Sequence, residues 1–311
     1  MTDAAGCNNT RLGGLRGIVT VLNTPFTETG EEIDYRALVR HIDYALAAGV
    51  SGFLAPAMAG EATCLTSAER LELTRVMVEA VQGRAMVIGC ATSDAPGESV
   101  ILAERLTQLG CDGVLIAIPF SDEKQLFVRM GEIARTTPGF IMLQDWDPVG
   151  HGIPVPVIKR LFDAMPLFKC VKIEVAEAGP KYSEVLAATG GLLHVSGGWA
   201  VTQMMEGLDR GVHAFMPTAM HHTYVAICRQ YSAGNREDAR KLFYRLLPVL
   251  TFANQSLDTS IHFFKRLLYR QGIYTNPAVR APERPLDNYQ SAIADELVMY
   301  AVELEYELRW R

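Results

Sequence analysis

The stretch Phe168-Lys169-Cys170-Val171-Lys172-Ile173-Glu174 has the composition of a short buried β-strand, apolar and β-branched, with a lysine near its C-terminal end. Burying an ammonium group is costly unless the group is ion-paired or loses its proton. Lys172 is therefore either a structural cation, paired for instance with Glu174, or an amine kept neutral for chemistry. The place of this strand in the fold decides between these two alternatives.

Strand-like and helix-like segments alternate on both sides of this stretch. The strands are near-continuous apolar runs, such as residues 113–119, as expected of a parallel sheet covered on both faces. Local signals bound the helices: Asp34 and Gly49 delimit one, and Thr66 with Glu69 forms a capping box for the next. Eight such alternations favour an α/β fold of the (β/α)8 or TIM-barrel type over an open, doubly wound sheet.

Three regions are predicted along the chain. Residues 1–14 are polar and contain glycine, and they are expected to form a flexible tail. Residues 15–234 hold the eight strand–helix units of the barrel. Residues 235–311 are helical by periodicity and too long to be one helix, so they are expected to form an appended C-terminal bundle of about three helices packed on the barrel.

Composition excludes several classes of partner. The chain has 311 residues, of which 49% are hydrophobic and 21% charged, and a net charge of −6 gives no reason to expect nucleic acid or an anionic membrane. No apolar run approaches the ~20 residues of a membrane span. Six scattered cysteines without a C-x-x-C pair favour free thiols and a cytoplasmic location. No cluster has metal-ligand spacing, so no metal is expected.

Barrel active sites are built at the C-terminal ends of the strands. Among the polar residues expected there, Lys172 is the one lysine, and strand alternation places its side chain inside the barrel. This position favours a lysine that forms a Schiff base, whose amine must be deprotonated against a free pKa of ~10.4. The other groups expected at the strand ends are Thr24, Gly60-Glu61, Thr92-Ser93, Phe120-Ser121, Gln144-Asp145, Glu174, Ser196-Gly197-Gly198 and Thr218 with His221-His222.

From Gly17 to about Val249 these motifs resemble the dihydrodipicolinate synthase / N-acetylneuraminate lyase superfamily of lysine Schiff-base lyases. Residues 17–26 match its N-terminal signature, Gly60-Glu61 with the segment 65–70 matches its second loop and helix, and Lys172 falls at the position of its imine-forming lysine. The resemblance implies a (β/α)8 barrel, a small-molecule 2-keto acid bound as an imine on Lys172 with no separate cofactor, and a homo-oligomer, either a dimer or a tetramer.

The departures from the family pattern concern proton transfer. The second loop, usually Gly-Thr-Thr-Gly-Glu, is Ala57-Met58-Ala59-Gly60-Glu61 here, so both hydroxyls are missing and backbone N–H donors remain. The usual tyrosine of strand five is replaced by Gln144, and an amide cannot shuttle protons as a phenol does. No arginine stands between Arg135 and Arg160, where dihydrodipicolinate synthases bind the carboxylate of their second substrate.

Residues 141–145 and 171–174 are most similar to one branch of the superfamily, the dehydratases of 2-keto-3-deoxy sugar acids, especially L-2-keto-3-deoxyarabonate. In that chemistry an imine at C2 acidifies the C3 proton, and a β-hydroxyl then leaves as water. The available proton carriers are Glu174, Asp145, Glu61 and a histidine. Each has a structural alternative: a counter-ion for Lys172, a loop cap, a loop hydrogen-bond acceptor, and a solvated helix cap at His221-His222.

The sequence thus predicts a Schiff-base-forming lyase acting on a 2-keto acid, a dehydratase or aldolase of a 2-keto-3-deoxy sugar acid. Two alternatives stay open: condensation of pyruvate with an aldehyde, as in dihydrodipicolinate synthase, and a non-catalytic keto-acid-binding or scaffold protein. The expected catalytic residues are Lys172 and Gln144. The expected substrate-binding residues are Met58, Ala59, Gly60, Glu61, Asp145, Glu174, Gly197 and Phe215.

Overall fold

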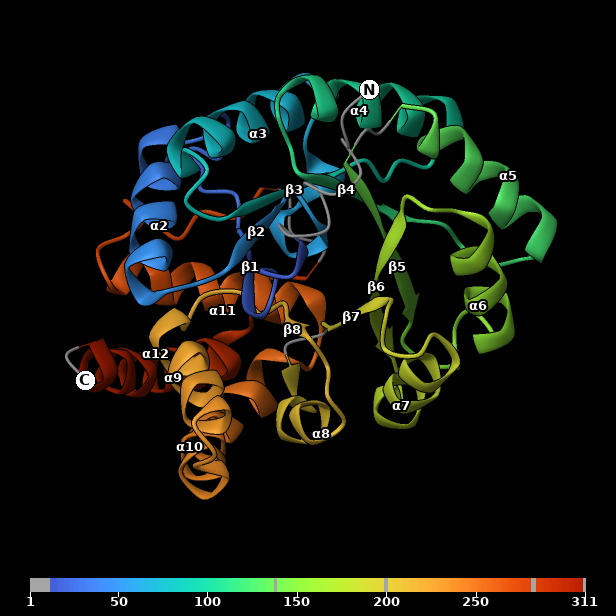
Figure 1. Ribbon diagram of the computed structural model, residues 1–311. Helices are drawn as coiled ribbons and strands as arrows, with labels where there is room; N and C mark the ends of the chain where they lie inside the picture. The colour runs from blue at the N-terminus through green and yellow to red at the C-terminus, as the bar shows by residue number, and fades with distance from the viewer. Residues whose placement is uncertain (1–11, 137–138, 199–200, 281–283, 310–311) are drawn as a thin grey trace. The chain divides into compact units, whose positions relative to one another are not determined.

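A computed structural model describes residues 12–136, 139–198, 201–280 and 284–309. Within these ranges eight strands pair in sequence order and close into a parallel barrel, which confirms the predicted TIM-barrel fold (Figure 1). The strands are β1 (Gly17–Val21), β2 (Gly52–Ala55), β3 (Met86–Cys90), β4 (Gly113–Ala117), β5 (Phe140–Asp147), β6 (Phe168–Val175), β7 (His194–Gly197) and β8 (Ala214–Phe215).

Helices follow the strands, as the sequence predicts. They are α2 (Tyr35–Ala48), α3 (Ser67–Val81), α4 (Pro96–Gln108), α5 (Glu123–Ala134), α6 (Val155–Ala164), α7 (Ala178–Ala188), α8 (Met204–Asp209), α9 (His221–Ser232), α10 (Arg236–Ala253), α11 (Leu257–Arg270) and α12 (Asn288–Arg309). Two short 3₁₀ turns, η1 (Met58–Gly60) and η2 (Ala62–Cys64), form the loop after β2. None of the described helices is long and apolar enough to cross a membrane.

The local signals read from the sequence are present. Asp34 caps α2, Gly49 ends it in the left-handed conformation, and Thr66 and Glu69 form the reciprocal capping box of α3. Helix α8 begins only at Met204. Val201 has a φ of +54°, which a β-branched residue adopts only outside a right-handed helix.

The chain divides into two compact units, each with its own packing. One takes in Met1–Gly17 and Met86–Met216, where the fully buried Val114, Leu115 and Ile116 of β4 are typical of a strand covered on both faces. Helices α6 and α7 pack on β6 in this unit (Figure 1). The tail expected at residues 1–14 falls largely on residues 1–11, outside the described part of the chain. The predicted boundaries at 14 and 234 stay predictions.

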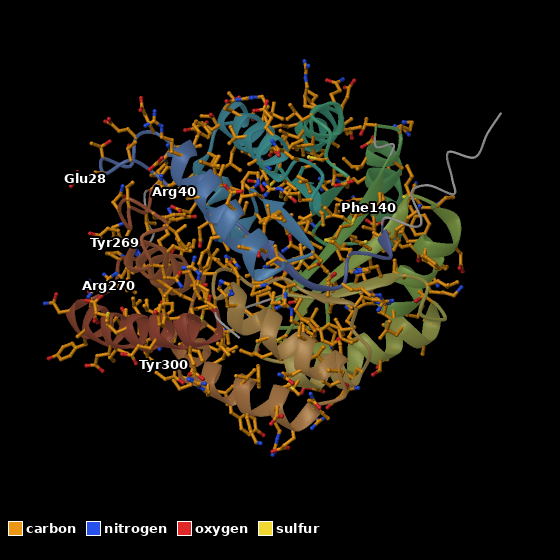
Figure 2. All side chains as sticks on the ribbon, turned by 60° about the vertical axis from the view of Figure 1, so that its left-hand side comes forward. Glu28, Arg40, Phe140, Tyr269, Arg270 and Tyr300 are labelled. Atoms are coloured by element: carbon orange, nitrogen blue, oxygen red, sulfur yellow. The ribbon has the colours of Figure 1, made fainter. Side chains whose placement is uncertain are left out.

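The other unit takes in Ile18–Ala85 and Pro217–Arg311 and contains the predicted C-terminal helices α10, α11 and α12. Arg40 of α2 donates a 2.9 Å hydrogen bond to the carbonyl of Ile273, just after α11, and Tyr269 and Arg270 lie on the same side of the molecule (Figure 2). The first helices of the chain are therefore tied directly to its last ones.

The start of α9 differs from the solvated cap proposed for His221-His222. His221 is fully buried: its Nδ1 lies 3.2 Å from the Thr20 hydroxyl and its Nε2 lies 2.9 Å from Nε2 of His41. Glu305 of α12 caps the helix instead and accepts a 2.8 Å hydrogen bond from the backbone N–H of Thr223. A carboxylate satisfies the free N–H groups of a helix start and also favours its positive end, so His221 is not needed there.

Candidate active site

Strands β5 and β6 bring the two predicted catalytic residues together. Gln144 is paired with Lys172 in the parallel register, and Trp146 is paired with Glu174 two residues further along each strand. Lys169 is the additional residue of a register shift, paired with neither Ile141 nor Met142, so the alternation of faces runs unbroken only from Cys170 onward. Lys172 and Glu174 therefore project from the same face of β6.

Lys172 is 4% exposed, and its Nζ lies 3.0 Å from Oε1 of Glu174. The second carboxylate oxygen, Oε2, accepts a 2.5 Å hydrogen bond from Nε2 of Gln144. Glu174 is thus bonded on one side by an amine and on the other by an amide, which fixes its orientation. A carboxylate held against an amine can accept or return a proton at an atom bound to that amine.

A cavity of about 360 Å³ begins at Glu174 and lies at the C-terminal ends of β5 to β8. Its walls are aromatic and apolar with a few polar groups, a composition typical of small-molecule sites. The residues that matter for its chemistry are Trp146, Glu174, Tyr182, Thr202, Gln203 and Phe215.

Two glycines at the end of β7 are required by close approach. A β-carbon on Gly198 would collide with the Glu174 carboxylate, and one on Gly197 would come within 2.8 Å of the Tyr182 hydroxyl and 3.0 Å of the Phe215 ring. Contacts below 3.0 Å force neighbouring atoms to shift. The predicted residues Gly197 and Phe215 thus lie close together, and Phe215 lines the cavity with Gly198. The two glycines leave space for neighbouring side chains rather than forming a tight turn alone.

Asp145 does not join this cluster. Its Oδ2 is 2.5 Å from Nζ of Lys181, and its Oδ1 accepts a 2.8 Å hydrogen bond from the backbone N–H of Ile153. Burial raises the pKa of Asp145, while Lys181 opposes that shift. One oxygen is bonded within the loop that follows β5 and the other is paired with Lys181 of α7, so the Asp145 carboxylate holds this loop and helix together.

The loop of Met58, Ala59, Gly60 and Glu61 belongs to the other unit of the chain. The Asn23 amide donates a 2.7 Å hydrogen bond to the Ala59 carbonyl, and the Thr24 hydroxyl donates one of 2.6 Å to the Gly60 carbonyl. Both donors follow β1. They fix the direction of the loop carbonyls, and therefore of its backbone N–H groups.

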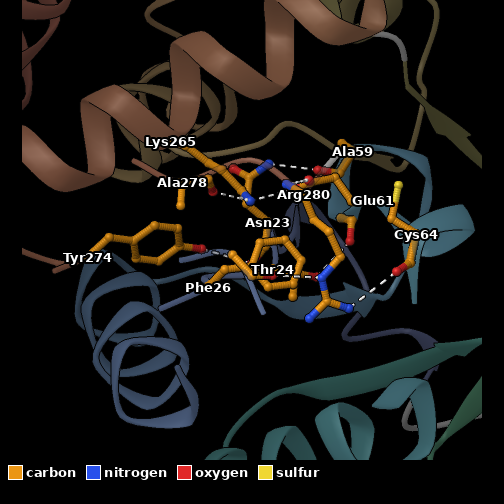
Figure 3. Close-up of polar contacts among 12 residues, drawn as sticks. Asn23, Thr24, Phe26, Ala59, Glu61, Cys64, Lys265, Tyr274, Ala278 and Arg280 are labelled. Atoms are coloured by element: carbon orange, nitrogen blue, oxygen red, sulfur yellow. Dashed lines mark hydrogen bonds and ion pairs between the residues drawn. The ribbon is translucent and has the colours of Figure 1, made fainter. Parts of the chain in front are cut away.

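Glu61 is the anchor of this loop (Figure 3). It has a φ of +57°, its Oε1 accepts a 2.8 Å hydrogen bond from the backbone N–H of Arg280, and its Oε2 is ion-paired with Nζ of Lys265. Lys265 is fully buried, donates to the Ala278 carbonyl at 2.8 Å and lies 4.3 Å over the Phe26 ring. Burial raises the pKa of Glu61 and lowers that of Lys265 to about 8, while their mutual attraction opposes both shifts.

Sequence reasoning missed three of these side chains: Tyr182, Lys265 and Arg280. A signal for Tyr182 does exist, because Ala178, Tyr182 and Val185 repeat at helical spacing just after the lysine strand and form the buried face of α7. Lys265 carries no such signal, since its partner is distant in sequence. In the described part of the chain, no three His, Cys, Asp or Glu side chains are grouped as potential metal ligands.

Comparison with known proteins identifies the family of this chain. A model of the Dihydrodipicolinate synthetase family matches residues 14–299. The L-2-keto-3-deoxyarabonate dehydratase of Azospirillum brasilense is 26% identical over 306 residues, which cover 95% of this chain and 96% of that protein. The 4-hydroxy-tetrahydrodipicolinate synthase of Methanococcus maripaludis is 27% identical over 243 residues, covering 76% and 82%.

Among solved structures, the 4-hydroxy-tetrahydrodipicolinate synthase from Methylacidiphilum fumariolicum SolV has a TM-score of 0.82 at 24% identity and covers 94% of this chain and 98% of its own. This likeness extends over the whole barrel fold. Because the family model matches almost the entire length, the chain belongs to the dihydrodipicolinate synthetase family.

Proposed function

We propose that this lyase-family protein acts on a 2-keto acid through a Schiff base on Lys172, as a dehydratase or aldolase of a 2-keto-3-deoxy sugar acid. The observation that carries the proposal is the contact between the Lys172 amine and the Glu174 carboxylate, 3.0 Å apart at the edge of a cavity. The similarity to an L-2-keto-3-deoxyarabonate dehydratase over 95% of the chain supports the choice of substrate class.

The chemistry follows from that contact. Lys172 passes a proton to Glu174 and adds to the C2 carbonyl as an amine. The C2 oxygen then leaves as water with that proton, and the iminium ion that remains acidifies the C3 hydrogen. Glu174 takes the C3 proton, the electron pair forms the C3–C4 double bond, and the C4–O bond breaks. The hydroxyl leaves as water with the proton returned by Glu174. Gln144 holds the Glu174 carboxylate by its amide N–H and does not itself carry a proton.

Condensation of pyruvate with an aldehyde is the second candidate, because several of the similar proteins are 4-hydroxy-tetrahydrodipicolinate synthases. Gln144 in place of the family tyrosine, and the lack of arginine between Arg135 and Arg160, argue against it. Product analysis with pyruvate and aspartate semialdehyde, beside 2-keto-3-deoxy acids alone, separates the two reactions. A non-catalytic keto-acid-binding protein would be stabilised by these acids without turning any of them over.

The decisive experiment is borohydride trapping followed by mass spectrometry. Pyruvate or a 2-keto-3-deoxy acid should leave a reduced adduct on Lys172, and the adduct should vanish in Lys172→Ala. Lys169→Ala, a half-buried lysine on the same strand, is the matched control and should be trapped as the wild type is. If a folded wild-type protein forms no adduct with any of these acids, the Schiff-base mechanism is wrong.

Three further expectations accompany this proposal. The imine needs no metal or separate cofactor, since the electron sink is the iminium nitrogen itself. A homo-oligomer, dimer or tetramer, is expected and can be checked by light scattering. The cytoplasm is the expected compartment: the five cysteines in the described residues are free thiols, while Cys7 lies outside them.

A further inference from the structure

Tyr182 is a buried phenol that the proposed chemistry does not use. It lies in the second turn of α7 and is 3% exposed. Its side chain forms part of the cavity wall together with Glu174, Phe215 and Gln203. A β-carbon on Gly197 would lie 2.8 Å from the phenol oxygen, so the hydroxyl reaches the end of β7 and is not directed toward bulk solvent.

The surroundings of this hydroxyl favour a hydrogen-bond donor. Burial, with the nearby carboxylates of Glu174 and Glu206, raises the pKa of Tyr182, so the phenol keeps its proton at neutral pH. Buried hydroxyls in folded proteins are almost always hydrogen-bonded. The hydrogen bonds recorded among the described residues do not include this hydroxyl, whose side chain instead faces a cavity large enough for a ligand.

The rest of the cavity indicates the chemistry of that ligand. Trp146 and Phe215 contribute aromatic side chains, and Thr202 and Gln203 contribute polar ones. Glu174 lies at the end nearest Lys172. Aromatic walls with a few hydrogen-bonding groups suit a carbon chain bearing hydroxyls. A keto acid held at C2 by Lys172 and at C3 by Glu174 would extend its remaining carbons into this space.

We propose that Tyr182 determines substrate specificity by donating a hydrogen bond to the terminal hydroxyl of a 2-keto-3-deoxy sugar acid. This inference rests on the proposed function and adds to it the residue that distinguishes a hydroxylated tail from an apolar one. A site built to hydrogen-bond a substrate hydroxyl rejects the analogue that lacks it, because a buried polar group is then left unpaired.

The test compares two acids that differ only at C5. A 2-keto-3-deoxypentonate carries hydroxyls at C4 and C5, whereas 4-hydroxy-2-oxopentanoate keeps the C4 hydroxyl and ends in a methyl group. For each acid the half-saturating concentration for borohydride trapping is measured in the wild type and in Tyr182→Phe. We expect Tyr182→Phe to raise it about 10- to 100-fold for the pentonate and less than about 3-fold for the methyl analogue.

Controls distinguish a failure of the role of Tyr182 from a failure of the proposed Schiff-base reaction. Pyruvate has no tail, so Tyr182→Phe should be trapped by pyruvate as the wild type is; absence of trapping in the wild type would instead overturn the Schiff-base proposal. Tyr224→Phe, which removes a fully buried phenol elsewhere, should change neither acid. An equal loss for both acids in Tyr182→Phe, or no loss for either, overturns the role of Tyr182.

Discussion

Two buried lysine–glutamate pairs in this protein resemble each other in composition and differ in what surrounds them. Lys172 and Glu174 are two positions apart on β6, and Glu174 faces the cavity. Lys265 and Glu61 come from opposite ends of the chain, and Lys265 is sealed by the Ala278 carbonyl and the Phe26 ring (Figure 3).

Burial of a lysine–glutamate pair does not by itself indicate a chemical role. Moving two charges out of water costs several kcal/mol per ion, and good partners only offset that cost. Lys265 has several partners that hold it charged, and its pair fixes a loop. Lys172 instead contacts Glu174, which lines a cavity large enough for a small molecule. In the proposed function, this link to a cavity, rather than burial or pairing, distinguishes Lys172 from Lys265.

The largest expected effect concerns Lys172 and Glu174, and it tests whether the Glu174 carboxylate takes part in the reaction. Glu174→Gln keeps the shape and a hydrogen-bonding side chain but removes the proton acceptor. We expect turnover of a 2-keto-3-deoxy acid to fall about 10²- to 10⁴-fold, while borohydride trapping on Lys172 persists. Glu177→Gln, an exposed neighbour, is the control. Unchanged turnover in Glu174→Gln would make Glu174 a simple counter-ion.

The next largest effect concerns stability and tests the buried ion pair of Lys265 and Glu61. Lys265→Met leaves Glu61 buried without its counter-ion, which should lower the free energy of unfolding by about 3–5 kcal/mol. Chemical denaturation measures this change in the free energy of unfolding, and Lys172→Met is the variant for comparison. Because Glu174 lies at a cavity, that variant should lose less stability. The double variant Lys265→Met/Glu61→Leu should regain much of the loss, and equal losses in the two single variants would erase the distinction.

A smaller effect concerns how the stability of the fold depends on pH in the acid range. Burial lowers the pKa of His41 to about 3, and this ring lies 3.0 Å from the hydroxyl of Tyr274, which donates to the Asn23 carbonyl. The unfolded chain binds this proton near pH 6.5 and the folded chain does not, so stability falls as the pH drops from 6.5 toward 3. Between pH 7 and 5 the loss from His41 should be about 2 kcal/mol.

Denaturation midpoints of the wild type and of His41→Asn, measured from pH 7 to 5, check this slope. The variant starts from lower stability but should depend less steeply on pH. His151→Asn, which removes an exposed imidazole, should keep the wild-type slope. An unaltered slope in His41→Asn would mean that other groups govern the acid response.

Local sequence signals predicted the elements of this fold and the position of its central lysine. The capping box at Thr66 and Glu69 involves residues three apart, and the eightfold alternation places Lys172 at a strand end without any tertiary knowledge. Such local signals could not predict contacts between residues that are distant in the sequence. Nothing near Glu61 indicates Lys265, and nothing near His221 indicates that Glu305 takes over its capping role.

In the candidate site, too, some residues were predicted from the sequence and others were missed. Gln144, Lys172 and Glu174 were predicted from their places at strand ends and from the family resemblance, and the parallel register of β5 and β6 brings them together. Tyr182 was missed because helix periodicity reveals a buried face but not the cavity that the face meets. For Asp145, spacing could not show that Lys181 and Ile153 would occupy both of its oxygens.

The pairing of Glu61 with Lys265 also sets an order of events during synthesis. The ribosome releases the segment Ile18–Ala85 long before Pro217–Arg311, yet the two form one compact unit. Until residue 265 emerges, Glu61 has no counter-ion, and its loop keeps a solvated carboxylate rather than a buried one. The segment Ile18–Ala85 can therefore complete its contacts in this unit only after the C-terminal helices have been synthesised.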